Sequence, residues 1–194
     1  MQSTITTESF DPFRMHAGQH LYAFDHVVQN PNFMKWPASV DKHHNWDGGL
    51  AHHTWEVIKI GLQISQEVKL DKEILVIAGL WHDYGKLWAY KIESTTIGGH
   101  NYGSSWIETS NKHLTGGHLA RSYAEWIHYC SGLQMDEEFA DAVGHCILSH
   151  HGSREWGSTA RPQTNEAFVL HMADQISARL LGGEELAKQH DVRF

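Results

Sequence analysis

Apolar residues recur at helical spacing in most long segments of this chain, whereas alternating, strand-like runs are scarce. Over residues 50–68 this spacing predicts a helix with His53 near its start. Asp71 is suited to cap a second apolar helix, which we expect over residues 72–82. The pattern therefore predicts an all-α protein.

The rest of the chain divides in the same way. Helices are expected over residues 11–26, 117–131, 136–149 and 164–181, and loops over residues 30–47, 94–117 and 152–163. The loop over residues 94–117 is rich in Gly, Ser, Thr and Asn, and a loop of this length is more often functional than idle, so it is a candidate lid. We expect an N-terminal accessory helix within residues 1–29, one catalytic domain over residues 30–182 and a C-terminal tail over residues 183–194.

Composition narrows the function and the partners. Seventeen histidines in 194 residues are a marked excess, whereas 41% hydrophobic and 20% charged residues are ordinary for a globular protein. The net charge of −8 opposes binding to long nucleic acid but leaves room for a small or short phosphorylated substrate. No run approaches the roughly 18 apolar residues of a membrane span, and no secretory signal order is present, so we expect a cytoplasmic protein with no membrane partner.

Part of the histidine excess falls into an ordered set with two aspartates. Imidazole nitrogens and carboxylate oxygens are ligands for first-row divalent metals. Seven such groups are too many for one tetrahedral ion, so convergence would favour two metals bridged by one carboxylate, an arrangement suited to displacement at a phosphoester. The set comprises His53, His82, Asp83, His118, His150, His151 and Asp174.

Each ligand also has a simpler interpretation. An isolated histidine on an apolar helix is more often a packed or surface residue than a ligand. Asp83 and Asp174 are harder to explain in this way, because each lies in an apolar helical run where an unpaired buried carboxylate would cost several kcal/mol. Metal coordination or a salt bridge would offset that cost. Lys86, three residues after Asp83, is placed to hold a phosphate oxygen.

The ordered set and its flanking residues resemble the HD superfamily of metal-dependent phosphohydrolases, and within it the HD domain of the YhaM-type 3′-5′ exoribonucleases. The resemblance covers roughly residues 30 to 180 and is carried by motifs of high specificity. These are His43-His44-Asn45-Trp46-Asp47-Gly48-Gly49-Leu50-Ala51-His52-His53-Thr54, Trp81-His82-Asp83-Tyr84-Gly85-Lys86, Gly116-Gly117-His118-Leu119 and the stretch from His145 through Ser149-His150-His151-Gly152 to Asp174.

The resemblance implies an all-α HD bundle with a dinuclear centre. One metal would be held by His53, His82, Asp83 and Asp174, and the other by Asp83, His118, His150 and His151. The ions would be Mn, Fe, Co, Ni, Zn or Mg, since such ligands do not select one metal. Asp83 and Lys86 would be catalytic, and Lys86, Arg161, Glu155 and His44 would contact substrate.

The predicted ligand set and the resemblance are compatible with three functions. The leading one is hydrolysis of a phosphodiester or phosphoester, either in short single-stranded nucleic acid or in a nucleotide. The second is a di-iron oxygenase acting on a small organic substrate, because the same ligands serve both chemistries, although Lys86 favours phosphate. The third is a regulatory metal-binding module that works with a separate nucleic-acid-binding subunit. Oligomeric state is left open.

Overall fold

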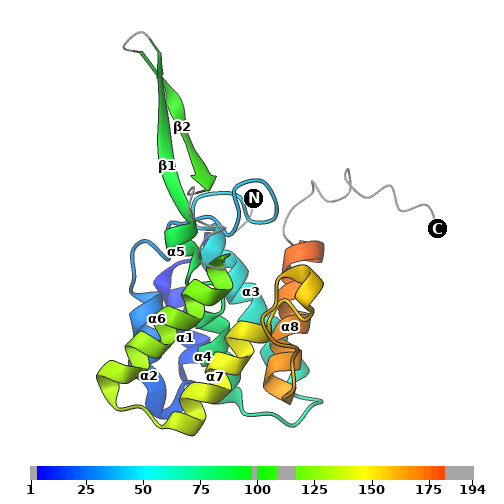
Figure 1. Cartoon of the computed structure of the whole chain (residues 1–194). Helices are drawn as coiled ribbons and strands as arrows, with labels where there is room; N and C mark the ends of the chain where they lie inside the picture. Colours follow the sequence, from blue (N-terminus) through cyan, green and yellow to red (C-terminus); the bar gives the residue numbers. More distant parts are fainter. Residues whose placement is uncertain (1–3, 98–99, 109–116, 182–194) are drawn as a thin grey trace, which may run out of the picture.

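The computed structural model describes residues 4–97, 100–108 and 117–181. Its body is a bundle of helices from which a two-stranded hairpin projects (Figure 1). The confirmed α-helical class rests on helices whose ends lie within a few residues of the predicted positions. They are α3 (Gly49–Ile64), α4 (Lys72–Trp81), α6 (Gly117–Leu133), α7 (Glu137–Ser149) and α8 (Asn165–Ile176).

Helix α4 lies at the centre of the bundle. Every residue from Leu75 to Trp81 is buried, and α4 contacts α2 (Leu21–Val28), α3, α6, α7 and α8. Asp71 caps its start as predicted, because Oδ1 accepts hydrogen bonds from the backbone N–H groups of Glu73 at 2.8 Å and Ile74 at 3.3 Å. Since α4 is enclosed by its neighbours, the residues that follow its last turn emerge inside the protein.

The N-terminal segment differs from the single helix predicted over residues 11–26. It forms η1 (Thr7–Phe10), α1 (Asp11–Arg14), η2 (Gly18–His20) and α2 in succession. The predicted helix is interrupted at Gly18, which has a φ of +49°. A Cβ atom at this position would collide with the carboxylate of Glu73. Phe10 and Phe24 from this segment belong to the same hydrophobic core as α3 and α4.

The prediction of an irregular loop over residues 94–117 is wrong for residues 94–97 and 100–108, which belong to two strands. Strands β1 (Tyr90–Ile97) and β2 (His100–Glu108) pair antiparallel and project from the helical body (Figure 1). At the base of the hairpin, Trp106 packs against Trp36 with ring centroids 4.6 Å apart and donates to Asp47 at 2.8 Å. The hairpin is thereby fixed to the loop over residues 30–47. A lid role stays a prediction, and residues 109–116 lie outside the described part.

Three short elements complete the described chain: α5 (Lys86–Ala89), η4 (Arg154–Trp156) and the π-helical turn η5 (Ser177–Leu181), which continues α8. The predicted tail over residues 183–194 lies outside the described residues. Among the helices of the described part, none has the length and apolar character needed to cross a membrane.

Candidate metal centre

Three predicted histidine ligands have one ring nitrogen fixed by a backbone carbonyl. The Nδ1 atoms of His82 and His150 lie 2.7 Å from the carbonyl oxygens of Gly79 and Ile147, each three residues earlier. His151 Nδ1 lies 2.8 Å from the carbonyl oxygen of Trp156. Because a carbonyl only accepts, Nδ1 carries the proton, and in the neutral ring Nε2 keeps a lone pair for a metal.

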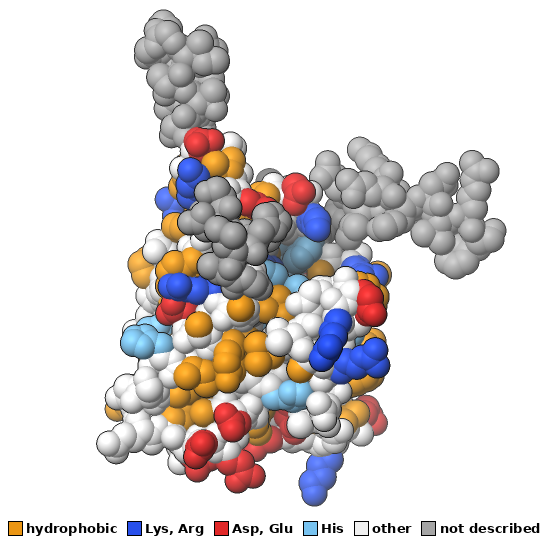
Figure 2. Space-filling model, viewed as in Figure 1, with side chains coloured by type: hydrophobic (Ala, Val, Ile, Leu, Met, Phe, Trp, Pro, Cys, Tyr) orange, Lys and Arg blue, Asp and Glu red, His pale blue; other side chains and the backbone are white. Residues whose placement is uncertain are grey.

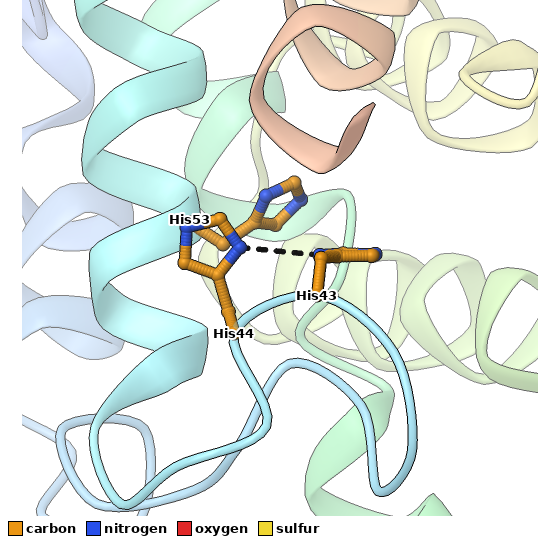
Figure 3. Close-up of side chains that lie close together, drawn as sticks. All are labelled: His43, His44 and His53. Carbon is orange, nitrogen blue, oxygen red and sulfur yellow. Dashed lines mark hydrogen bonds between the residues drawn. The ribbon is translucent and has the colours of Figure 1, made fainter. Parts of the chain in front are cut away.

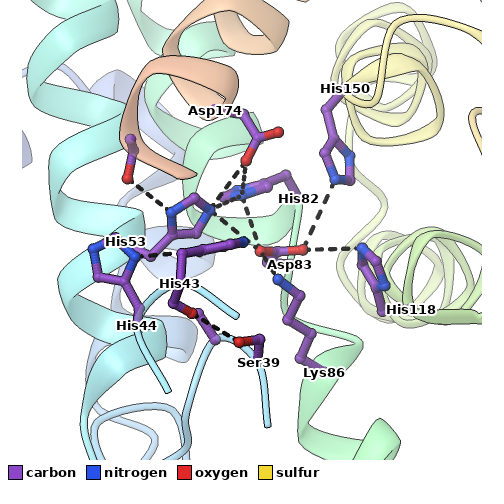
Figure 4. Close-up of polar contacts among 12 residues, drawn as sticks. Ser39, His43, His44, His53, His82, Asp83, Lys86, His118, His150 and Asp174 are labelled. Atoms are coloured by element: carbon purple, nitrogen blue, oxygen red, sulfur yellow. Dashed lines mark hydrogen bonds and ion pairs between the residues drawn. The ribbon is translucent and has the colours of Figure 1, made fainter. Parts of the chain in front are cut away.

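Asp83 lies between two groups of these rings (Figure 4). Its carboxylate oxygen Oδ2 is 3.4 Å from Nε2 of His53 and 3.3 Å from Nε2 of His82. Its other oxygen, Oδ1, is 3.3 Å from Nε2 of His118 and 3.8 Å from Nε2 of His150. The two oxygens of one buried carboxylate therefore face two different pairs of imidazoles.

Two further predicted ligands complete the groups. Asp174 on α8 places Oδ1 3.1 Å from Nε2 of His53, and 3.9 Å from Nε2 of His82. On the other side, His118, His150 and His151 each present one ring nitrogen to a cluster in which these three atoms lie within 4.8 Å of one another. The fold thus brings together all seven ligands that the sequence pattern predicted.

The donor set fits two divalent ions. Ligand atoms that share one ion at bond lengths near 2.1 Å lie about 3.0–3.4 Å apart, close to most of the distances around Asp83. Asp83 Oδ1 and His118 Nε2 are buried and have no hydrogen-bond partner among the described residues. Leaving buried polar atoms unsatisfied is costly, and in the tautomer that binds metal, with the proton on Nδ1 of His118, both atoms would present lone pairs. Bound metal would satisfy both atoms.

The charge states of the buried histidines also suit a metal. Burial lowers the pKa of the His118 imidazole to about 3, and burial also lowers the pKa of His150 well below its ordinary value. These rings are therefore neutral at pH 7, which is the form that binds metals. Burial lowers the pKa of His53 as well, but hydrogen bonds with Asp174 and Asp83 outweigh it, so its pKa is raised. A proton and a metal compete for Nε2 of that ring.

Lys86 pairs directly with the bridging carboxylate. Its Nζ lies 2.6 Å from Oδ2 of Asp83, and both side chains are buried. Burial raises the pKa of Asp83, but the charge of Lys86, followed by that of His82, outweighs it and holds this pKa well below the usual range. Burial lowers the pKa of Lys86, but the charge of Asp83 outweighs it, so this pKa is raised. Lys86 therefore keeps its positive charge inside the site.

Sequence reasoning missed a polar network behind His53. Glu56 accepts a hydrogen bond from the Ser177 hydroxyl at 2.8 Å, and that hydroxyl in turn lies 2.8 Å from Nδ1 of His53. Because the hydroxyl donates to Glu56, it accepts from Nδ1 of His53, and in the neutral ring Nε2 keeps its lone pair. Glu56 lies one helical turn after His52 and His53 on α3, which is the signal that could have identified it.

His43 and His44 extend this network toward the predicted metal ligands. Their ring centroids lie 5.0 and 5.3 Å from that of His53, and their Nδ1 atoms are 3.2 Å apart (Figure 3). Nε2 of His44 is 3.1 Å from Glu56. Burial, followed by the charge of His53, lowers the pKa of His43 to about 2, so its ring is neutral. The sequence placed both histidines in a loop without assigning His43 a role.

A cavity of about 470 Å³ opens over these ligands. Of the predicted substrate contacts, Lys86 lines it, whereas His44 is buried beside Glu56, and Glu155 and Arg161 are exposed outside its lining. Side chains that the sequence analysis did not assign to substrate line it instead. They include Lys42, His43, Tyr90, Trp156 and Arg179.

Comparison with known proteins decides the family. A family model described as the HD domain matches residues 50–179, which is well over half of the chain. The chain belongs to the HD domain family. The seven converging residues lie in or between the elements of this HD domain, from α3 to α8.

Curated relatives of this HD domain protein carry the name 3′-5′ exoribonuclease YhaM. Those from Bacillus subtilis (strain 168), Bacillus velezensis and Shouchella clausii are 29%, 31% and 33% identical over 93%, 80% and 76% of this chain. The matches cover 54%, 47% and 43% of those proteins, so the chain spans about half the length of the curated relatives it matches. No solved structure matches the chain.

Proposed function

We propose that this HD domain protein is a metal-dependent phosphodiesterase that removes nucleotides from the 3′ end of short single-stranded nucleic acid. The observation that carries the proposal is the position of Asp83, whose two oxygens face two separate groups of histidines at 3.3–3.8 Å. Two divalent ions held there would supply Lewis-acid stabilisation of charge at phosphorus. The names of the relatives support nucleic acid as the substrate.

The protein's own side chains would hold and orient the phosphate. Lys86 presents a buried positive charge to the cavity, and a phosphate oxygen beside it would gain a charge-assisted hydrogen bond. His53 and His82, with Asp174, would hold one ion, while His118, His150 and His151 would hold the other. Because carbonyl groups fix the orientation of His82, His150 and His151, little reorganisation of these rings would accompany the reaction.

The charge distribution supports a short, charged substrate. On the face shown in Figure 2, a group of acidic side chains lies at the end of the body opposite the hairpin. The cavity lies at the hairpin end, since its lining includes Tyr90 and Glu108 from the base of the hairpin. Lys42, Lys86 and Arg179 also line it, and they balance the carboxylates of Asp83, Glu108 and Asp174 in the same lining, so two bound divalent ions would make the cavity positive toward an anion.

The test is product release by protein loaded with Mn²⁺. A short RNA, a single-stranded DNA of the same sequence, mononucleotides and cyclic nucleotides are supplied separately, beside an Asp83→Ala variant whose fold is checked by circular dichroism. We expect stepwise release of mononucleotides from the oligonucleotides and no release by the variant. Turnover of free nucleotides alone would replace the proposal with a nucleotidase.

Failure across the whole panel would reject phosphoester hydrolysis. Oxygen uptake by the iron-loaded protein with a small organic substrate would then support the oxygenase alternative. Metal binding without turnover in either assay would support a regulatory module. Fe²⁺, Co²⁺, Ni²⁺, Zn²⁺ and Mg²⁺ are tested in parallel, because ligands of this kind do not select a single metal.

A further inference from the structure

Trp156 is exposed at the edge of the cavity over the metal ligands. It is 54% exposed, more than any other tryptophan among the described residues, and it lines the cavity. An indole exposed to this extent contributes little to the core, so packing alone does not account for its position. An aromatic face beside a polar, phosphate-sized site is a surface on which a planar ring can stack.

The backbone of Trp156 is fixed relative to a proposed metal ligand. Its carbonyl oxygen lies 2.8 Å from Nδ1 of His151, and its N–H donates to the carbonyl oxygen of Ser153 at 3.1 Å. Gly157 ends the turn with a φ of +89°, a conformation that glycine adopts without strain. The backbone that carries the indole is therefore held next to the centre on which a phosphate would bind.

A cation lies over the same indole. The guanidinium carbon of Arg179 is 5.4 Å from the ring centroid of Trp156, and Arg179 also lines the cavity. Arg179 belongs to η5, five residues after the ligand Asp174, and its side chain is exposed. An aromatic platform with an adjacent guanidinium offers a nucleobase a stacking partner and offers the neighbouring phosphate a cation.

We propose that Trp156 and Arg179 form a nucleoside subsite next to the metal centre. The base of a nucleotide adjoining the cleaved bond stacks on the indole of Trp156, and Arg179 pairs with a neighbouring phosphate of the strand. This inference rests on the proposed function and deepens it. The inferred substrate is a single strand whose bases contribute to binding by stacking. Stacking does not select a sequence, because every base has a π-face.

The experiment couples a change in the protein to a change in the substrate. An RNA of about ten nucleotides is compared with two otherwise identical strands that lack the base at the last or the penultimate position. Stacking of one base contributes about 1–3 kcal/mol, or roughly 5- to 150-fold. We expect one abasic strand to lose kcat/KM by a factor in this range with the wild-type protein, mainly through KM.

The Trp156→Ala variant should show a similar loss on the complete strand and no further loss, within about twofold, on the abasic strand. Such non-additivity is the signature of two groups that act together. Trp156→Phe, which keeps an aromatic face, should retain most of the dependence on the base. This second variant keeps the test decisive if Trp156→Ala fails to fold.

Arg121→Ala is the matched control for Arg179→Ala. Arg121 lies over the ring of Trp88 at 4.4 Å and is absent from the cavity lining. We expect Arg179→Ala to raise KM for the complete strand about tenfold and Arg121→Ala to leave it unchanged, because only Arg179 reaches the substrate. Equal effects of the two variants would count against a role for Arg179.

The outcomes separate this inference from the proposed function. Cleavage by the wild-type protein with equal abasic losses in wild type and Trp156→Ala overturns the nucleoside subsite and leaves the phosphodiesterase intact. No cleavage of any strand by the metal-loaded wild-type protein overturns both. Loss of base dependence in Trp156→Ala, with retention in Trp156→Phe, supports the subsite.

Discussion

The ammonium nitrogen of Lys86 lies 2.6 Å from Oδ2 of Asp83, and both side chains are buried. Without metal this is the charge-assisted contact that compensates the carboxylate inside the protein. With metal bound, the ions would compensate Asp83 and leave the ammonium group to the substrate. The pair therefore links the stability of the metal-free protein to the chemistry of the loaded one.

Replacing Lys86 by methionine should destabilise the metal-free protein more than the loaded protein. Removal of one partner of a buried ion pair typically costs about 3–5 kcal/mol, because the other charge is left uncompensated. Bound metal would supply that compensation. The free energy of unfolding is measured by urea denaturation with and without Mn²⁺. An equal loss in both conditions would mean that the metal does not reach Asp83.

Substitution of single carboxylates should change metal stoichiometry unequally. We expect Asp83→Asn to lower the metal content below one ion per chain, since its two oxygens serve both groups. Asp174→Asn should remove one ion, because Asp174 lies against His53 and His82. Metal per chain is counted by mass spectrometry after dialysis. Asp25→Asn, at a surface pair with Arg14, is the control.

Loss of the Ser177 hydroxyl should weaken metal binding without unfolding the protein. Ser177 accepts from Nδ1 of His53 and donates to Glu56, so it fixes which nitrogen of His53 is bare. Loss of such a supporting contact typically costs 10- to 100-fold in metal affinity, and we expect an effect in this range. Competition with a metal-binding dye measures the affinity.

Two further variants interpret this result. Ser177→Thr keeps the hydroxyl and should restore most of the affinity. Ser65→Ala removes a hydroxyl that bonds to the backbone at the end of α3, and it should leave metal binding unchanged. A loss with Ser65→Ala as large as that with Ser177→Ala would indicate a general effect of serine removal.

The metal-free protein should lose stability as the pH falls below about 6.5. Burial lowers the pKa of His43 to about 2 and that of His118 to about 3, and burial also lowers the pKa of His150. These groups bind protons in the unfolded chain near pH 6.5 but remain neutral when folded, so acid favours unfolding. The raised pKa of His53 has the opposite effect on stability, because this one group binds a proton more readily in the folded protein.

Scanning calorimetry of the metal-free protein at pH 7.5, 6.0 and 5.0 measures this dependence. We expect the unfolding temperature to fall at each step. A His118→Ala variant should show a smaller fall, because one of the proton-linked groups is absent. An unfolding temperature that stays constant from pH 7.5 to 5.0 would contradict the assignment of neutral, buried imidazoles.

The predictions from sequence succeeded where local patterns decide the structure. Helical spacing located α3 and α4, and the cap at Asp71 marked the start of α4. The break at Gly18 was missed because it depends on Glu73, far along the chain. The hairpin was missed because its polar residues resemble a loop, although Gly98-Gly99 between two β-prone segments is a recognised hairpin signal.

In the candidate site, too, local motifs predicted some residues, whereas others depend on contacts between distant segments. The convergence of the seven predicted ligands could be anticipated because each lies in a short motif with a fixed order along the chain. The support of His53 by Ser177 and the contact of Trp156 with Arg179 join segments that are distant in sequence, so no local pattern reveals them. The proposed substrate contacts depend on the same long-range packing.

The contact between His53 and Ser177 joins residues 124 positions apart, and it holds the start of η5, the last described helical turn, against α3. The donor group of His53, His82 and Asp174 can therefore be complete only after α8 has docked on α3. A fragment that ends before residue 165 would keep six of the seven predicted ligands, lacking Asp174, and would also lack the docking of α8 on α3. Metal uptake would report completion of the tertiary structure, and metal added during refolding would select chains that have made this last contact.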